Sequence, residues 1–363
     1  MRSTRLTALS GALLIGAMPV AAQELEYSTH LPPGVLVMRG VQQVFDAVST
    51  ATGGTVTAKY FWAGQLHDAA GNFEAVSEGV VDAAFTQPAS NQAELRTNLI
   101  FSDLWMLGDN PWVTAAALNE TILLDCQACQ DEYADNNTIF LGAHAGTPTN
   151  MVCRDEITSM AQLAGLRMNG LPALRGWIDR LGGARVNVPP PRQLEALQRS
   201  EMDCTFISPE WLTAFSVAEG AGSIIRVSTG SQFATSMMTM NLDTWNDLPD
   251  EARAAFRTAM PQAIAYVVAG YVAADEEALQ AAEARGIPFT TLDGAYEAAL
   301  AEYMATYAEE VIAAATERGV ANPEEIVATF IENLEKWQAI IAEQGTDNYA
   351  QLLGDEIYAH LHD

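Results

Sequence analysis

The chain has 363 residues, of which 18 are basic and 46 acidic, so its formal net charge at pH 7 is −28. A surface this acidic repels nucleic acid and anionic lipid headgroups, so we expect neither as a partner. The length is sufficient for two domains, each with a hydrophobic core of its own.

Residues 1–22 predict a secretory signal peptide. Arg2 and Arg5 precede a short apolar run, which ends in Val20-Ala21-Ala22 before Gln23. A charged start, an apolar centre and small residues at the cleavage site are typical of such peptides, and a buried N-terminal helix is the alternative. No later segment has the roughly 18 uninterrupted apolar residues of a spanning helix. We therefore expect a periplasmic protein without direct membrane insertion after cleavage.

The first part of the mature chain alternates strands and helices. Strands are predicted over 25–30, 56–62 and 80–86, and helices over 37–50 and 71–79. This βαβαβ order predicts a parallel sheet with helices on both faces. Ligands of such sheets bind beyond the carboxyl ends of the strands. His30, which follows the first strand, is thus a candidate donor to a ligand, or else a hydrogen-bonded histidine of the domain surface.

The chain has four cysteines, and four cysteines allow three disulfide pairings. We favour Cys126–Cys129 and Cys153–Cys204, because the second pair would join two strands of the second lobe. The alternative for the first pair is a redox Cys-x-x-Cys motif, which normally follows a strand and opens a helix. Here the motif lies in a polar, helix-like stretch over 123–133, which favours a structural disulfide. The spacing of the second pair does not suit zinc.

A second α/β region follows, and the chain ends in helices. The expected elements are strands 138–144, 149–153, 165–169, 185–188 and 204–207, helices 173–181 and 192–199, and a returning strand 232–241. Almost unbroken helix is predicted over 250–285, with a kink at Pro261. At about 1.5 Å per residue this helix reaches roughly 50 Å. Two amphipathic helices, 293–318 and 323–344, complete the chain.

Five groups of residues resemble motifs of one family in order and spacing. They are 61–66, 78–85, 163–170, 193–204 and 243–251. They resemble the extracytoplasmic solute-binding proteins of TRAP transporters, which are tripartite, ATP-independent and periplasmic. The resemblance implies a two-lobed α/β binding-protein fold with one long helix along both lobes. Lobe I would comprise 23–145 with about 232–275, and lobe II 146–231 with about 276–363.

The resemblance also implies a receptor for a small organic solute, most often an organic acid, that delivers it to TRAP membrane subunits. Asn169 stands where family members normally have an Arg that grips a substrate carboxylate, although Asn is also a common turn residue before Gly. An Arg–carboxylate fork contributes roughly 1.5–3 kcal/mol, whereas an amide has no charge. The cations that could replace the anchor are Arg167, Arg175 and Arg192.

Other positions of the family's site also differ in this chain. Many members have a second Arg where this chain has Thr149 or Asn150, and some bind a metal through a Glu near Phe206. A Phe cannot bind a metal ion, so we expect neither a metal nor a cofactor. Trp62 and Trp105 stand where the family has prolines near the mouth of the site. Further candidates for an aromatic lining are Phe85, Phe206, Trp211 and Phe233, although each alone is more often a core residue.

Fewer charges and more rings fit a partly apolar organic acid, or a betaine-like or neutral compound held over ring faces. The rival classes are an exported enzyme and a sensor subunit. The sequence has no Gly-x-Ser-x-Gly elbow, no His-Glu-x-x-His motif and no phosphate loop. We therefore expect a receptor rather than an enzyme, with ligand shifting an open–closed equilibrium toward the closed state.

Overall fold

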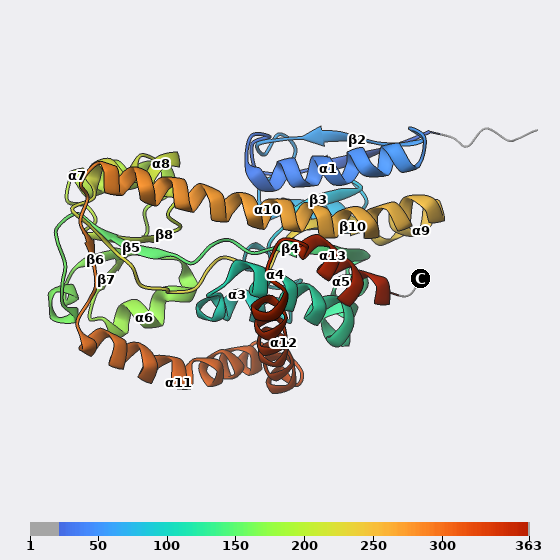
Figure 1. The fold of residues 1–363 in the computed structure, drawn as a ribbon. Helices are drawn as coiled ribbons and strands as arrows, with labels where there is room; N and C mark the ends of the chain where they lie inside the picture. The colour runs from blue at the N-terminus through green and yellow to red at the C-terminus, as the bar shows by residue number, and fades with distance from the viewer. Residues whose placement is uncertain (1–21, 362–363) are drawn as a thin grey trace, which may run out of the picture.

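The computed structural model describes residues 22–361, so the predicted signal peptide lies outside the described residues apart from Ala22. Two β-sheets, each packed with helices, form two lobes that lie side by side (Figure 1). The predicted two-lobed α/β fold is confirmed. Within 22–361, no helix has both the length and the apolar character that crossing a membrane requires.

The sheet of lobe I has the strand order β2-β1-β3-β10-β4. Its strands and the helices between the first three are β1 (Gln23–Ser28), α1 (Leu36–Ala51), β2 (Val56–Phe61), α2 (Gly71–Ser77), β3 (Ala83–Thr86), β4 (Thr138–His144) and β10 (Thr235–Asn241). β1 runs parallel to β2 and β3, whereas β10 runs antiparallel to β3 and β4. The carboxyl ends of β1 to β4 therefore lie at one edge of the sheet, beside the start of β10.

Between β3 and β4 the chain forms α3 (Leu99–Asp103), α4 (Pro111–Glu120) and α5 (Gln127–Asp135). A π-helical turn, Thr121–Asp125, follows α4, and Cys126 is the N-cap of α5. The Cys129 N–H donates to the Cys126 sulfur over 3.2 Å. The Cys-x-x-Cys pair therefore opens a helix, which differs from its expected place within one, because the π-helical turn ends before Cys126. The pair forms the predicted disulfide.

The sheet of lobe II has the strand order β11-β9-β5-β8-β6-β7. Its strands are β5 (Asn150–Cys153), β6 (Arg167–Asn169), β7 (Ala184–Val186), β8 (Cys204–Ile207), β9 (Ser223–Ile225) and β11 (Phe289–Thr290), and its short helices are α6 (Arg175–Arg180), α7 (Gln193–Gln198) and α8 (Trp211–Ala214). β6 is parallel to β7 and β8, whereas β5 is antiparallel to β8 and β9. The carboxyl ends of β6 and β8 thus lie at one edge.

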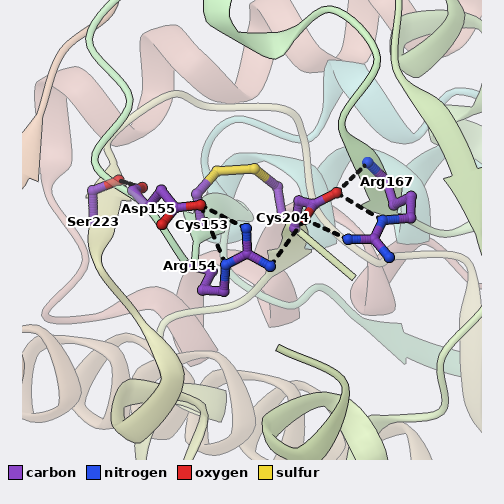
Figure 2. A network of polar contacts seen from close by, with 7 residues as sticks. Cys153, Arg154, Asp155, Arg167, Cys204 and Ser223 are labelled. Atoms are coloured by element: carbon purple, nitrogen blue, oxygen red, sulfur yellow. Dashed lines mark hydrogen bonds and ion pairs between the residues drawn. A yellow bond between two sulfur atoms is a disulfide. The ribbon is translucent and has the colours of Figure 1, made fainter. Parts of the chain in front are cut away.

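The second predicted disulfide, Cys153–Cys204, joins residues that lie directly opposite each other on β5 and β8. Arg154 and Arg167 flank the disulfide in Figure 2, and both form ion pairs with Asp203, at 3.2 and 2.8 Å. The three adjacent strands β5, β8 and β6 are therefore tied together by one covalent bond and by a carboxylate shared between two arginines.

The long helix α10 (Asp250–Ala284) has 35 residues and runs along both lobes, as predicted (Figure 1). Pro261 lies inside it. α1 crosses it closely, because a Cβ added at Gly40 would lie 2.6 Å from a methyl group of Val267. The helix is therefore packed against the core of lobe I over its first half and reaches α8 of lobe II with its second half.

The chain ends in α11 (Gly294–Glu317), α12 (Pro323–Gln344) and α13 (Tyr349–Glu356). α11 contacts both α6 and α3. α12 packs against α4 of lobe I, where Trp337 and Lys336 donate to the buried Glu120 carboxylate over 2.6 and 2.7 Å. Residues from about 276 onward were predicted to form part of lobe II and the C-terminal helices, and of these helices α12 and α13 pack on lobe I. The amphipathic pattern shows which face of a helix is buried and does not show against what.

Candidate ligand site between the lobes

Three rings meet at the carboxyl ends of the strands of lobe I. His30 follows β1, Phe85 lies on β3, and His144 is the last residue of β4. The ring centres of His30 and Phe85 are 5.6 Å apart, and those of Phe85 and His144 are 6.4 Å apart. The structure therefore brings together His30 and Phe85, two predicted site residues, and adds His144, which sequence analysis did not assign to a ligand. We call these three residues the ring cluster.

Both histidines of the ring cluster have depressed pKa values. Burial lowers the pKa of His144 to about 4. Burial also lowers the pKa of His30, and the nearby charge of Asp68 opposes that effect. The Nδ1 atoms of both imidazoles are buried without a hydrogen-bond partner among residues 22–361. A buried polar atom without a partner costs about 1–3 kcal/mol, so such atoms usually bind a ligand or water.

Further buried polar atoms of the described residues have no hydrogen-bond partner. Thr235, the first residue of β10, pairs with His144 in the sheet, and its hydroxyl has no partner in the described structure. The Trp105 indole N–H and the Ser231 hydroxyl are likewise buried without a partner there, and the Trp105 carbonyl accepts the Ser231 N–H over 3.2 Å. The two hydroxyls and the indole are neutral hydrogen-bond donors. They could bind a carboxylate without the positive charge of an Arg fork.

Tyr271 of α10 links the ring cluster to lobe II. The Tyr271 ring stacks on His144, with centres 5.8 Å apart and planes inclined by 22°. Burial raises the Tyr271 pKa, and the negative charge of Glu210 raises it further. Glu210 lies in the loop between β8 and α8, and its N–H donates to Asp275 on the next turn of α10 over 2.8 Å. Groups from both lobes therefore meet at Tyr271.

Two carboxylates are held out of water at this junction. Asp275 is 8 % exposed, and burial raises its pKa to about 6. The Thr147 hydroxyl and the Glu210 N–H have the opposite effect and lower this pKa. Burial and the charge of Asp275 raise the Glu210 pKa, which the Trp211 indole opposes. Among the described residues, no ion pair includes either carboxylate. The junction therefore has negative charge that no side chain compensates.

A groove of about 630 Å³ opens beside Asp275. Thr147 and the predicted site residue Asn150 line it, together with Arg226. The Arg226 guanidinium lies over the Phe289 ring, 5.0 Å from its centre. Sequence analysis missed Arg226, Tyr271 and Asp275. For Arg226 the sequence offers one signal, because this residue follows a short apolar run that forms β9.

In lobe II, Asn169 is 7 % exposed and uses its amide within the lobe. Its oxygen accepts the Val188 N–H over 2.8 Å, and its nitrogen donates to the Thr205 hydroxyl over 3.2 Å. Phe206 is buried on the opposite face of β8 from Thr205, close to Gly170. Asn169 and Phe206 therefore lie on neighbouring strands but point to opposite sides of the sheet.

The arginines proposed to replace the missing anchor lie apart from the ring cluster. Arg167 donates to both oxygens of Asp203 over 2.8–2.9 Å. Arg192 is exposed and pairs with Glu201 at 3.4 Å, and Arg175 is exposed on α6. Arg167 and Arg192 thus have carboxylate partners of their own in lobe II.

The remaining predicted residues are spread over the junction and the cores. Trp211 lies beside Glu210 and packs edge-on against Phe215. Trp62 stacks on Tyr60 at 4.7 Å, and Phe233 stacks on Phe330 of α12 at 5.6 Å. The Thr149 hydroxyl shares a hydrogen bond of 2.7 Å with Thr229 where two linking segments cross. Trp211 and Thr149 therefore lie at the junction, whereas Trp62 and Phe233 pack mainly against rings of lobe I.

Two antiparallel segments, 145–149 and 229–234, connect the lobes together with α10. The Gly146 N–H donates to Gln232 over 2.7 Å, and the Thr149 N–H donates to Gly230 over 2.8 Å. Gly230 has a φ of +79°, and a Cβ added there would lie 2.0 Å from the Trp105 carbonyl oxygen. Only glycine fits at this crossing without a shift of the backbone.

The family model described as bacterial extracellular solute-binding protein, family 7, matches residues 27–314. A curated relative, the monocarboxylate 2-oxoacid-binding periplasmic protein of Nostoc sp., is 25% identical over an alignment of 277 residues that covers 69% of this chain and 69% of the relative.

Solved structures of TRAP periplasmic solute-binding proteins share the fold. A protein of Desulfovibrio salexigens has a TM-score of 0.74 and 18% identity, covering 90% of this chain and 98% of its own. One from Rhodoferax ferrireducens, in complex with benzoate, has a TM-score of 0.71 and 21% identity, with 87% and 99% covered. One from Bordetella bronchiseptica, with bound mandelate, has a TM-score of 0.68 and 20% identity, with 86% and 99% covered.

Proposed function

Because the chain belongs to the bacterial extracellular solute-binding proteins of family 7, we propose that it binds a small organic acid between its lobes and delivers it to TRAP membrane subunits. Members of this family and the solved fold neighbours are solute-binding receptors. The observation that carries the proposal is the ring cluster with its unpartnered buried atoms at the strand ends. The relatives support an acid, because they bind 2-oxoacids, benzoate or mandelate.

The proposed acid has a partly apolar body. The faces of Phe85 and His144 form an aromatic wall for such a body, and neutral imidazole, indole and hydroxyl groups beside it supply hydrogen bonds without a cation. Asn169 stands in place of the anchoring Arg and keeps one amide hydrogen beyond those used within lobe II. We place the carboxylate among these neutral groups. We also propose that residues 1–22 are a signal peptide that directs the chain to the periplasm.

The first test is native mass spectrometry of the freshly purified protein, followed by identification of any released compound and a thermal-shift screen with benzoate, mandelate, pyroglutamate and pyruvate. We expect an acid to be released or at least one acid to raise the melting temperature. Phe85→Ala is expected to lower affinity for that acid at least tenfold, whereas Arg199→Ala, on the exposed end of α7, is the control. If no acid is released and none shifts the melting temperature, the proposed ligand class is wrong.

A second test addresses Asn169. Introducing the charge by Asn169→Arg is expected to raise the affinity for simple carboxylates such as benzoate, because a guanidinium forms a charged, bidentate contact with a carboxylate. Calorimetric titration of both proteins checks this. An unchanged ligand preference across the same acids would remove Asn169 from the proposed site.

A further inference from the structure

We infer that the solute also carries a positively charged nitrogen, which the Glu210 and Asp275 carboxylates bind beside the stacked rings of Tyr271 and His144. The inference rests on the proposed function, because it takes the junction of the lobes as the solute's site. The ligand class is then an amino acid or a betaine-like zwitterion rather than a simple anion.

The first argument is uncompensated charge. Glu210 comes from lobe II and Asp275 from α10, and the hydrogen bond of 2.8 Å between the Glu210 N–H and Asp275 holds them together. Arg226 lines the same groove as Asp275, but its guanidinium lies over Phe289. Burial raises the pKa values of both carboxyl groups, and the charge of Asp275 raises that of Glu210 further. A bound cation relieves both the repulsion and the desolvation.

The second argument is the chemistry beside the carboxylates. Tyr271 and His144 are stacked, and an aromatic face next to a carboxylate is a known kind of site for ammonium groups. His144 is 7 % exposed, and its unpartnered Nδ1 belongs to a neutral imidazole, which can accept a hydrogen bond. Thr147 is 5 % exposed and lines the groove beside Asp275, and its hydroxyl opposes the effect of burial on the Asp275 pKa.

An organic cation fits these groups better than a metal ion. Within residues 22–361, no group of three or more His, Cys, Asp or Glu side chains is arranged to hold a metal. Calcium takes about six to eight oxygen ligands, which two carboxylates cannot supply. A zwitterion matches the whole junction, because its carboxylate meets neutral donors near the ring cluster and its cationic nitrogen meets Glu210 and Asp275. Its neutral total charge also removes the need for an Arg anchor.

The test compares related solutes with and without a positively charged nitrogen. Phenylglycine, mandelate and phenylacetate have the same ring and carboxylate and carry an ammonium, a hydroxyl or a hydrogen, and proline and pyroglutamate form a second pair. Calorimetric titration at pH 7.5 is expected to show at least tenfold tighter binding of the ammonium member in one or both sets. Glu210→Gln and Asp275→Asn are expected to reduce that preference at least tenfold while cooperative unfolding is retained. Glu277→Gln, an exposed neighbour on α10, is the matched control.

The outcomes separate the two proposals. A preference for the ammonium member below tenfold in both sets overturns the inference, and so does binding of these acids with no binding of either amine. In both cases the proposed organic-acid receptor stands. Failure of every acid and every amine contradicts both proposals. Stabilisation by sodium or calcium chloride alone that disappears in Glu210→Gln would assign the carboxylates to a metal ion and also overturn the inference.

Discussion

Asn169 is the residue at which this chain departs most clearly from the family's motif, and its amide has a structural task. It accepts the Val188 N–H and donates to Thr205, whose hydroxyl donates to Gln193. The Asn169 side chain thus joins β6 to β8 and to the segment after β7 by hydrogen bonds. The missing charge must be supplied by other groups or by the solute itself.

We expect Asn169→Ala to lower the free energy of unfolding by about 1–3 kcal/mol, because the half-buried Val188 N–H loses its acceptor and the Thr205 hydroxyl loses a donor. Urea unfolding at pH 7.5 measures the change. Arg192→Ala is the control, since its exposed ion pair of 3.4 Å contributes at most about 1 kcal/mol. An Asn169→Ala protein as stable as the wild type would show that the amide does not hold this segment.

Asp275 is expected to lower the stability of the empty protein at neutral pH. Its pKa is raised to about 6 in the folded protein, compared with about 3.9 for an unperturbed Asp. Between these two values the folded chain keeps a proton that the unfolded chain has released. Stability therefore falls as pH rises through this window, by about 2–3 kcal/mol in total.

Asp275→Asn removes this charge and keeps an oxygen to accept the Glu210 N–H. The variant is expected to be about 1–3 kcal/mol more stable than the wild type at pH 7.5 and equally stable near pH 4. Chemical unfolding at pH 4, 5, 6 and 7.5 checks the prediction, with Glu277→Gln as the control. A variant that is less stable at pH 7.5 would mean that the ionised carboxylate supports the fold rather than the ligand.

At the scale of elements, the two disulfides differ in what they constrain. Cys153–Cys204 closes a chain segment with a sequence separation of 51, and Cys126–Cys129 one with a separation of 3. In the chain-entropy account, the first contributes about 4 kcal/mol and the second about 2 kcal/mol. The first also joins two central strands of lobe II, beside the shared Asp203 carboxylate.

The double variant Cys153→Ala/Cys204→Ala is therefore expected to lose about 4 kcal/mol of unfolding free energy, and Cys126→Ala/Cys129→Ala about 2 kcal/mol. Urea unfolding of both variants, without reductant, measures the difference. The wild type is also assayed for thiol–disulfide exchange, because Cys126–Cys129 opens α5 in the manner of redox motifs. A larger loss from the Cys126–Cys129 pair would contradict the ranking, and exchange activity that depends on this pair would favour the redox interpretation.

Sequence patterns predicted the longest helices well. α12 has the predicted bounds, and α10 ends one residue before the predicted end, because long runs show a clear period of apolar residues. β4 and β8 also have the predicted bounds, whereas the ten-residue helix α4 was not predicted. β9 and β11 were missed, since three and two residues are too few to show a period. The packing of α12 on lobe I depends on the buried Glu120, which attracts Trp337 and Lys336 from far along the chain. No local pattern contains that information.

At the scale of the whole molecule, the same limit applies to the site. His30 was proposed because it follows a predicted strand, and Phe85 as one of several aromatic residues that could line the site. Glu210 and Asp275 are 65 residues apart, and in the sequence each is one of many acidic residues. Only the course of α10 along both lobes brings the loop after β8 to Tyr271 and His144. The proposed role of Asn169 could therefore be drawn from the sequence, and the proposed role of Glu210 and Asp275 could not.

The position of the site between the lobes predicts a change of shape on binding. His30 and Phe85 belong to lobe I and Glu210 to lobe II, so a solute that contacts all three binds more tightly when the lobes are close. Small-angle X-ray scattering is expected to show a smaller radius of gyration with saturating solute than without it. In Glu210→Gln the decrease is expected to be smaller at equal saturation, because the contact with lobe II is weakened. An unchanged radius in the wild type, with binding confirmed by calorimetry, would show that the solute is held by one lobe alone and that closure is not part of its recognition.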